Sequence, residues 1–209
     1  MSHVVLLGDS IFDNARYVPE KPPVIEQVRR TIPANWKATL LAVDGHITGD
    51  VVGQLENMPS DATHLCISVG GNDALGASGL LREAACTVAD ALALLSEGLT
   101  QFRDEYHAML RAISAAGKPT TICTIYDAVP GLEKMEVMAL GFFNDVILRS
   151  AFMAGLPVID LRLVCNHSSD YSAVSPIEPS FTGGAKIAQA IKEALTSHDF
   201  SQRRSVIYS

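Results

Sequence analysis

Short apolar runs alternate along the chain with longer stretches in which apolar residues recur every three or four positions. Short runs bounded by glycine, proline or polar residues predict strands, and a period of 3.6 residues predicts helices. The predicted strands are residues 3–7, 37–43, 63–69, 119–126 and 157–161. The predicted helices are residues 23–32, 49–57, 80–116 with a break or bend near 96–98, 134–154 and 182–195.

These strands are almost continuously apolar, and helical stretches separate them. That order is typical of a parallel sheet covered by helices on both faces. We therefore predict an α/β fold, a three-layer α/β/α sandwich around a five-stranded parallel sheet. The chain of 209 residues has no repeat and no low-complexity linker, so we expect one domain over residues 1–197 and a polar, frayed C-terminal tail over residues 198–209.

Composition narrows the class of partner. A net charge of −7 and a pI near 5.3 argue against nucleic acid, whose phosphates need clustered Lys and Arg. No uninterrupted apolar run reaches the roughly 18 residues of a membrane span, and the N-terminal residues fit a first strand better than a signal peptide. The four scattered cysteines match no zinc-binding spacing, which predicts free thiols in a reducing cytoplasm and no metal site. The sequence carries no sign of an oligomeric state.

Residues with catalytic potential follow three successive predicted strands. Gly8-Asp9-Ser10 follows the first, Asp44-Gly45 the second and Gly70-Gly71-Asn72-Asp73 the third. The carboxyl ends of parallel strands meet at one edge of the sheet, where ligands of open α/β sheets bind. Each segment by itself is also an ordinary turn or helix cap. Their joint occurrence favours a site made of a serine hydroxyl, backbone N–H groups and an amide.

These motifs resemble those of the SGNH, or GDSL, hydrolase family, and the resemblance runs from Val4 to about Ile191. It implies a flavodoxin-like fold and the hydrolysis of esters or thioesters through an acyl-serine. Ser10 corresponds to the nucleophile. The backbone N–H groups of Ser10 and Gly45 and the side chain of Asn72 correspond to the oxyanion hole. No metal or organic cofactor is implied. The sequence has neither a P-loop nor a dinucleotide-binding glycine motif, and it lacks the Gly-x-Ser-x-Gly elbow.

The chain departs from the family where the general base is expected. The family motif Asp-x-x-His-Pro is replaced by Ser-Pro-Ile-Glu-Pro at residues 175–179, so that Glu178 stands for the histidine and Ser175 for the aspartate. We interpret Glu178 as a general base whose pKa is raised by partial burial, with Ser175 donating a hydrogen bond to it. The sequence therefore resembles an atypical member of the family.

A histidine is the alternative base. His167, three residues before Asp170, lies in the loop that contains Glu178, and His46 follows Gly45 at the same sheet edge. A pH profile is expected to separate the candidates, because histidine titrates near pH 6.5 and a glutamate well below that.

The substrate predicted from these motifs is a small carboxylic, thio- or sugar ester. Asp9, Ile11, Gly71 and Ile177 are the predicted substrate-binding residues, because they adjoin the catalytic motifs and are largely apolar or small. The alternative function is a catalytically inactive protein of the same fold that binds an acyl or sugar-ester ligand.

Overall fold

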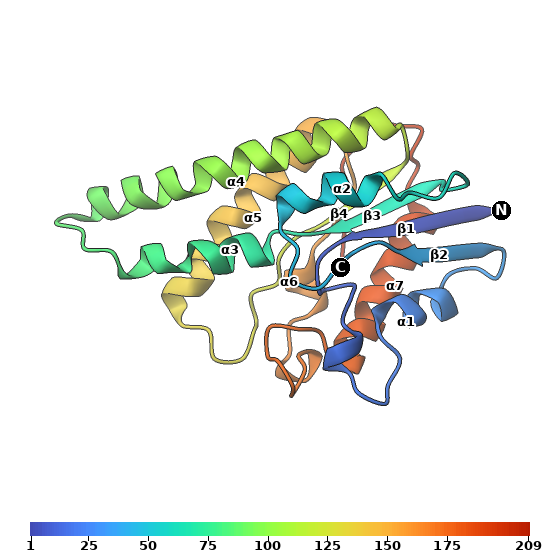
Figure 1. Cartoon of the computed structure of the whole chain (residues 1–209), viewed down its shortest axis with the longest axis horizontal. Coiled ribbons are helices and arrows are strands. Elements are labelled where there is room, and N and C mark those ends of the chain that lie inside the picture. The colour runs from blue at the N-terminus through green and yellow to red at the C-terminus, as the bar shows by residue number, and fades with distance from the viewer.

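The computed structural model describes all 209 residues and has three layers, with a parallel sheet between two layers of helices (Figure 1). The fold class predicted from the sequence is confirmed, with six strands in place of five. Their order across the sheet is β2-β1-β3-β4-β5-β6. The strands are β1 (Ser2–Gly8), β2 (Trp36–Leu40), β3 (His64–Ser68), β4 (Thr120–Cys123), β5 (Val158–Ile159) and β6 (Ile207–Tyr208).

Seven α-helices and four short 3₁₀ segments connect the strands. The helices are α1 (Val24–Thr31), α2 (Val51–Leu55), α3 (Gly71–Ala77), α4 (Val88–Ala116), α5 (Lys134–Ala154), α6 (Leu161–Val164) and α7 (Phe181–Ser197). The 3₁₀ segments are η1 (Ala15–Tyr17), η2 (Thr48–Asp50), η3 (Ser78–Arg82) and η4 (Ser168–Asp170).

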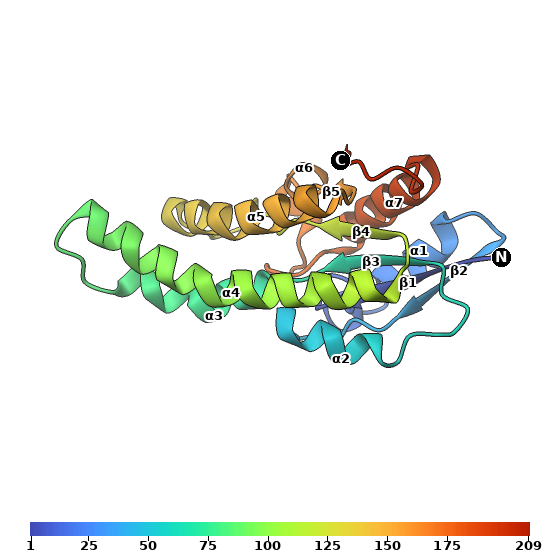
Figure 2. The same ribbon diagram turned by 90° about the horizontal axis from the view of Figure 1, so that it is seen from above.

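The alternation of side chains along β1 divides the core into two layers. Val4 and Leu6 point to the face covered by α1 and α7, whereas Val5 and Leu7 point to the face covered by α2, α4 and α5. All four are fully buried, which explains why the strand reads as a continuous apolar run. The carboxyl ends of the strands lie at one edge, and α3, η3 and the first half of α4 project beyond that edge (Figure 2).

The C-terminal tail differs from the prediction. Residues 198–209 were expected to be frayed, but Ile207 and Tyr208 pair in parallel with Val158 and Ile159 of β5 and form the sixth strand. Tyr208 is buried. A two-residue strand in a polar tail has no periodicity to reveal it, because its pairing depends on an edge formed by residues fifty positions earlier.

The first part of the predicted helix 80–116 is also different. Its first turn is η3, and α4 begins only after Thr87, whose Oγ accepts a hydrogen bond from the N–H of Asp90 at 3.1 Å. From there α4 continues without a break. Gly98, which suggested a bend, lies under Leu80: a Cβ at this glycine would overlap the leucine side chain. The glycine allows close packing of η3 on α4.

Helix α5 is long and apolar enough, by length and composition alone, to cross a membrane. One such helix is weak evidence for a membrane span, because core helices pass the same criterion. In this fold its buried residues, among them Phe143 and Ile147, pack in the core with those of α4.

Gly8 is required where β1 ends, and we predict that Gly8→Ala strongly destabilises the fold. Its φ is +125°, and a Cβ would overlap the carbonyl oxygen of Ser68. Urea unfolding should give a loss of about 4 kcal/mol or more. The control is Gly117→Ala, at a φ of +64° with open space around it, which should cost about 1–2 kcal/mol. Equal losses for the two variants would contradict the close approach at Gly8.

Candidate active site

The turn after β1 exposes the backbone N–H of Ser10. The N–H of Asp9 donates to the carbonyl oxygen of Ser68 at 3.1 Å, and the carbonyl oxygen of Asp9 accepts from the N–H of Phe12 at 3.2 Å. These bonds fix the turn and leave the N–H of Ser10 with no acceptor in the protein. The side chain of Ser10 is 6% exposed and lines a cleft at the sheet edge.

The loops after β2 and β3 are joined beside Ser10. Gly45 adopts a φ of +86°, and its N–H also has no acceptor in the protein. Asn72, near the start of α3, donates from Nδ2 to the carbonyl oxygen of His46 at 2.8 Å, which leaves its second amide hydrogen free. The sequence-predicted donors thus lie on neighbouring loops. Ser10 and Asn72 line the cleft, and Gly45 stands beside it without lining it.

Two side chains hold the loop that contains Glu178. The hydroxyl of Tyr126 donates to the carbonyl oxygen of Ile177 at 2.6 Å, and Nδ2 of Asn14 donates to the carbonyl oxygen of Pro179 at 3.0 Å. Asn14 follows β1 and Tyr126 follows β4. The backbone on each side of Glu178 is therefore fixed relative to two strand ends.

The carboxyl group of Glu178 is buried next to Ser10. Glu178 is 4% exposed. This burial raises its pKa to about 7, the side chain of Ser10 lowers it in part, and the charge of Asp44 raises it further. Its Oε2 has no hydrogen-bond partner. The expected contribution of Ser175 is not found: its side chain makes no hydrogen bond to Glu178, and only its backbone carbonyl oxygen accepts from the Glu178 N–H at 3.1 Å.

Asp9 is a second buried carboxyl group at the same place. Burial raises its pKa to about 8, against the hydrogen bond that its Oδ1 accepts from the N–H of Ile11 at 3.1 Å, and the charge of Glu178 raises it further. Asp9 is therefore largely protonated at neutral pH. Its carboxyl group fixes the turn that holds Ser10. Because this carboxyl group is protonated, it places no second negative charge near Glu178.

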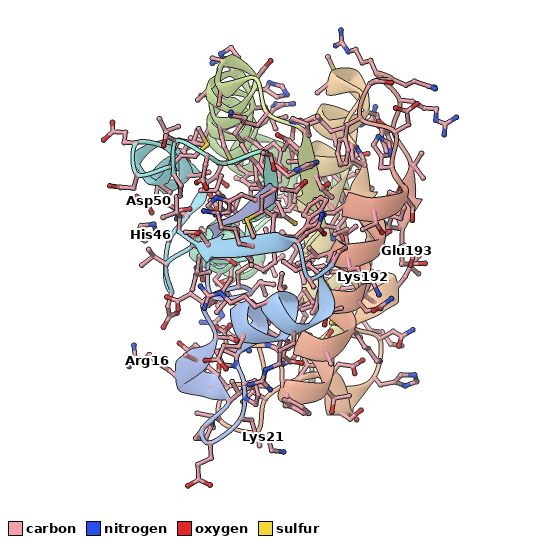
Figure 3. All side chains as sticks on the ribbon, turned by 90° about the vertical axis from the view of Figure 1, so that its right-hand side faces the viewer. Arg16, Lys21, His46, Asp50, Lys192 and Glu193 are labelled. Carbon is pink, nitrogen blue, oxygen red and sulfur yellow. The ribbon has the colours of Figure 1, made fainter.

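His46 is held away from Ser10. Its Nδ1 lies 2.9 Å from Nε2 of Gln54, and it lines a polar groove along α2 that includes Asp50. Figure 3 shows His46 next to Asp50, on the opposite side of the molecule from Lys192 of α7.

His167 is also separated from the cleft. It is exposed and does not line the cleft. Its backbone N–H donates to Oδ2 of Asp170 at 3.0 Å, and the same oxygen pairs with Nζ of Lys186 at 2.7 Å. The lysine already neutralises the aspartate that could have oriented His167.

A cleft begins at Ser10 and Glu178 and extends outward from the sheet edge. Its empty space is about 970 Å³, including the open space at its mouth. All the predicted catalytic and substrate-binding residues except Gly45 line it: Asp9, Ser10, Ile11, Gly71, Asn72, Ile177 and Glu178. Most of the other lining residues come from α3, η3, α4 and α5. Sequence reasoning missed those of η3 and α4 and most of those of α5, because apolar helical positions are usually core. No group of three or more His, Cys, Asp or Glu residues is placed to hold a metal ion.

The sequence matches no protein-family model and no curated protein. Solved structures resemble the fold closely. The lipase Lip_vut3 from a goat rumen metagenome has a TM-score of 0.73 at 17% identity, over 93% of this chain and 97% of that one. The acetyl xylan esterase AlAXEase has a TM-score of 0.66 at 17% identity, over 92% and 99%. A member of the lipolytic protein G-D-S-L family from Veillonella parvula has a TM-score of 0.63 at 17% identity, over 94% and 98%.

These matches, together with Gly8-Asp9-Ser10 at the end of β1, decide the fold. The chain has the SGNH/GDSL-type hydrolase fold. Within this fold the chain has a buried glutamate where the family motif has a histidine, as the sequence indicates.

The buried Asp9 predicts a pH-dependent stability. Because its folded pKa is raised to about 8, Asp9 favours the folded state below its ordinary pKa, and this contribution is lost as the pH rises through about 8. Asp9→Asn keeps an oxygen that can accept from Ile11 and has no charge to bury. In urea unfolding, the variant should gain about 3–4 kcal/mol relative to the unsubstituted protein between pH 5 and pH 8. An equal difference at the two pH values would contradict the raised pKa.

Proposed function

We propose that this protein hydrolyses esters through an acyl-serine, with Ser10 as the nucleophile and Glu178 as the general base. The Ser10 oxygen attacks the ester carbonyl carbon while its proton passes to Glu178. The C–O bond to the alcohol then breaks, and Glu178 returns the proton to the departing alcohol oxygen. Water then attacks the acyl carbon while Glu178 takes up its proton, the bond between the acyl carbon and the Ser10 oxygen breaks, and Glu178 returns the proton to Ser10 as the acid leaves. The substrate is a small-molecule carboxylic, thio- or sugar ester.

The observation that carries this proposal is the buried carboxyl group of Glu178 beside the Ser10 hydroxyl. A glutamate with the ordinary pKa of about 4.3 is a weak base for a serine, and general bases work best with a pKa near the working pH. Burial brings the pKa of Glu178 to about 7. Because Oε2 of Glu178 has no hydrogen-bond donor in the protein, nothing stabilises the charged form at that oxygen.

Three hydrogen-bond donors are assigned to stabilise the ester carbonyl oxygen, which becomes negatively charged when Ser10 attacks. The N–H groups of Ser10 and Gly45 have no acceptor in the protein, and Asn72 has one amide hydrogen to spare. Such fixed donors stabilise the charge that develops on the carbonyl oxygen. The names of the structurally similar proteins, lipases and acetyl xylan esterases among them, support an ester as the substrate.

Substitutions at the two central residues test the chemistry. Ser10→Ala should lower the hydrolysis of nitrophenyl butyrate by about 10³-fold or more, and Glu178→Gln should lower kcat by about 10²–10⁴-fold, because each removes one partner of the proton transfer. His167→Ala is the control and should keep full activity.

A fluorophosphonate should label Ser10 in the unsubstituted protein. Absence of both labelling and hydrolysis would favour the inactive binding protein, and loss of activity in His167→Ala would reassign the base.

The pH dependence follows from the pKa of Glu178. The base must be ionised, so kcat/KM should fall as the pH drops below about 7 and level off above it. With its pKa raised to about 7, Glu178 is expected to give an inflection close to that of a histidine, so the position of the inflection alone does not separate the two candidates. The profile must be compared with that of His46→Ala and His167→Ala, which should keep the inflection. An inflection below about pH 5 would contradict the raised pKa.

A further inference from the structure

We propose that the cleft holds the acyl chain of the substrate, so that this protein prefers esters of medium-length fatty acids of about eight carbons. The inference rests on the proposed function and specifies its substrate. Fifteen of the 23 lining residues are hydrophobic, which favours a hydrocarbon chain over a sugar. On one side are Ala74 and Leu75 of α3, Leu80 and Leu81 of η3, and Leu95 and Leu99 of α4; on the other are Ala139, Leu140, Phe142 and Phe143 of α5.

The polar groups outside the cleft decide which half of the ester enters it. Asp44 raises the pKa of Glu178 by its charge but does not line the cleft. Its Oδ2 accepts from the hydroxyl of Tyr17 at 2.9 Å, and Arg16 lies 3.5 Å from it. A polar alcohol fits these groups. The apolar cleft is then left for the acyl chain.

The helix positions along the cleft give its length. The lining residues of α5 extend from Glu136 to Phe143, which is about 10 Å at about 1.5 Å per residue. An extended chain with C–C bonds of about 1.5 Å advances about 1.25 Å per carbon, so about eight carbons fill this distance.

In the proposed arrangement the far end of the acyl chain lies at η3. This segment contacts both α4 and α5, and its Leu80 and Leu81 line the cleft. The close packing of Leu80 on Gly98 fixes η3 against α4. Removing the Leu80 side chain should therefore lengthen the space available to the chain, and filling the position of Ala139 should shorten it.

Nitrophenyl esters from acetate to dodecanoate test the preference. In the unsubstituted protein kcat/KM should rise about fourfold per methylene up to about eight carbons and then stop rising, because each buried methylene strengthens binding in the transition state. Leu80→Ala should move the limit to longer chains. Ala139→Phe should lower the ratio of octanoate to acetate hydrolysis at least tenfold. Ala93→Phe, an exposed position of α4 outside the cleft, is the matched control and should change neither.

Two isomeric esters test whether the acyl half or the alcohol half of the substrate occupies the cleft. Ethyl octanoate should be hydrolysed at least tenfold faster than octyl acetate. The reverse order would assign the cleft to the alkyl group of the alcohol and overturn the proposal, as would a flat or falling chain-length profile.

Binding of octanamide separates this inference from the proposed chemistry. Calorimetry should show octanamide binding at least tenfold more tightly than butanamide, with the difference lost in Ala139→Phe. A protein that binds octanamide in this way but hydrolyses no ester would retain the acyl cleft and refute the proposed hydrolysis. Equal binding of the two amides would refute the cleft.

Discussion

The burial of a carboxyl group against a serine hydroxyl is the constraint on which the site depends. A carboxylate removed from water holds its proton more strongly, and this moves the pKa of Glu178 to about 7. The same burial would be costly in a flexible loop. Here Tyr126 and Asn14 bind the backbone carbonyls of the two residues that flank Glu178, so the geometry is set by the ends of β4 and β1.

Burial also raises the pKa of Asp9, the second carboxyl group at this place. Two ionised carboxylates so close together would repel each other, and the site avoids this because Asp9 takes up a proton near neutral pH. The protonated Asp9 then serves the turn that presents Ser10. The two buried carboxyl groups differ in their partners: Asp9 accepts a hydrogen bond from its own turn, whereas Oε2 of Glu178 has no partner in the protein.

The sequence could predict the parts of the fold that depend on local pattern. The continuous apolar runs of β1 and β3 identify buried parallel strands, and Gly8, Gly45 and Asn72 are recognisable because they lie at or shortly after the ends of strands. The position of Glu178 was predictable from its motif. The missing hydrogen bond from Ser175 was not, because the direction of a side chain depends on how its loop packs. The edge strand at Ile207 depends on distant pairing and left no local signal.

The cleft could not be predicted for a related reason. Leu95 and Leu140 have the spacing of core residues, and only the projection of α4 and α5 beyond the sheet leaves their apolar faces partly uncovered. An apolar helical position looks the same in the sequence whether it packs on a strand or faces a ligand. Predicting the cleft therefore requires the relative placement in space of α4 and α5, which local sequence pattern does not give.

The central claim is tested most directly by titrating Glu178 itself. In the protein carrying ¹³C-labelled glutamate, the carboxyl resonance that is absent from Glu178→Gln should titrate near pH 7. It should titrate at higher pH in Ser10→Ala, because the Ser10 side chain lowers the pKa of Glu178. A titration near the ordinary pKa of about 4.3, or one that Ser10→Ala leaves unchanged, would contradict the account.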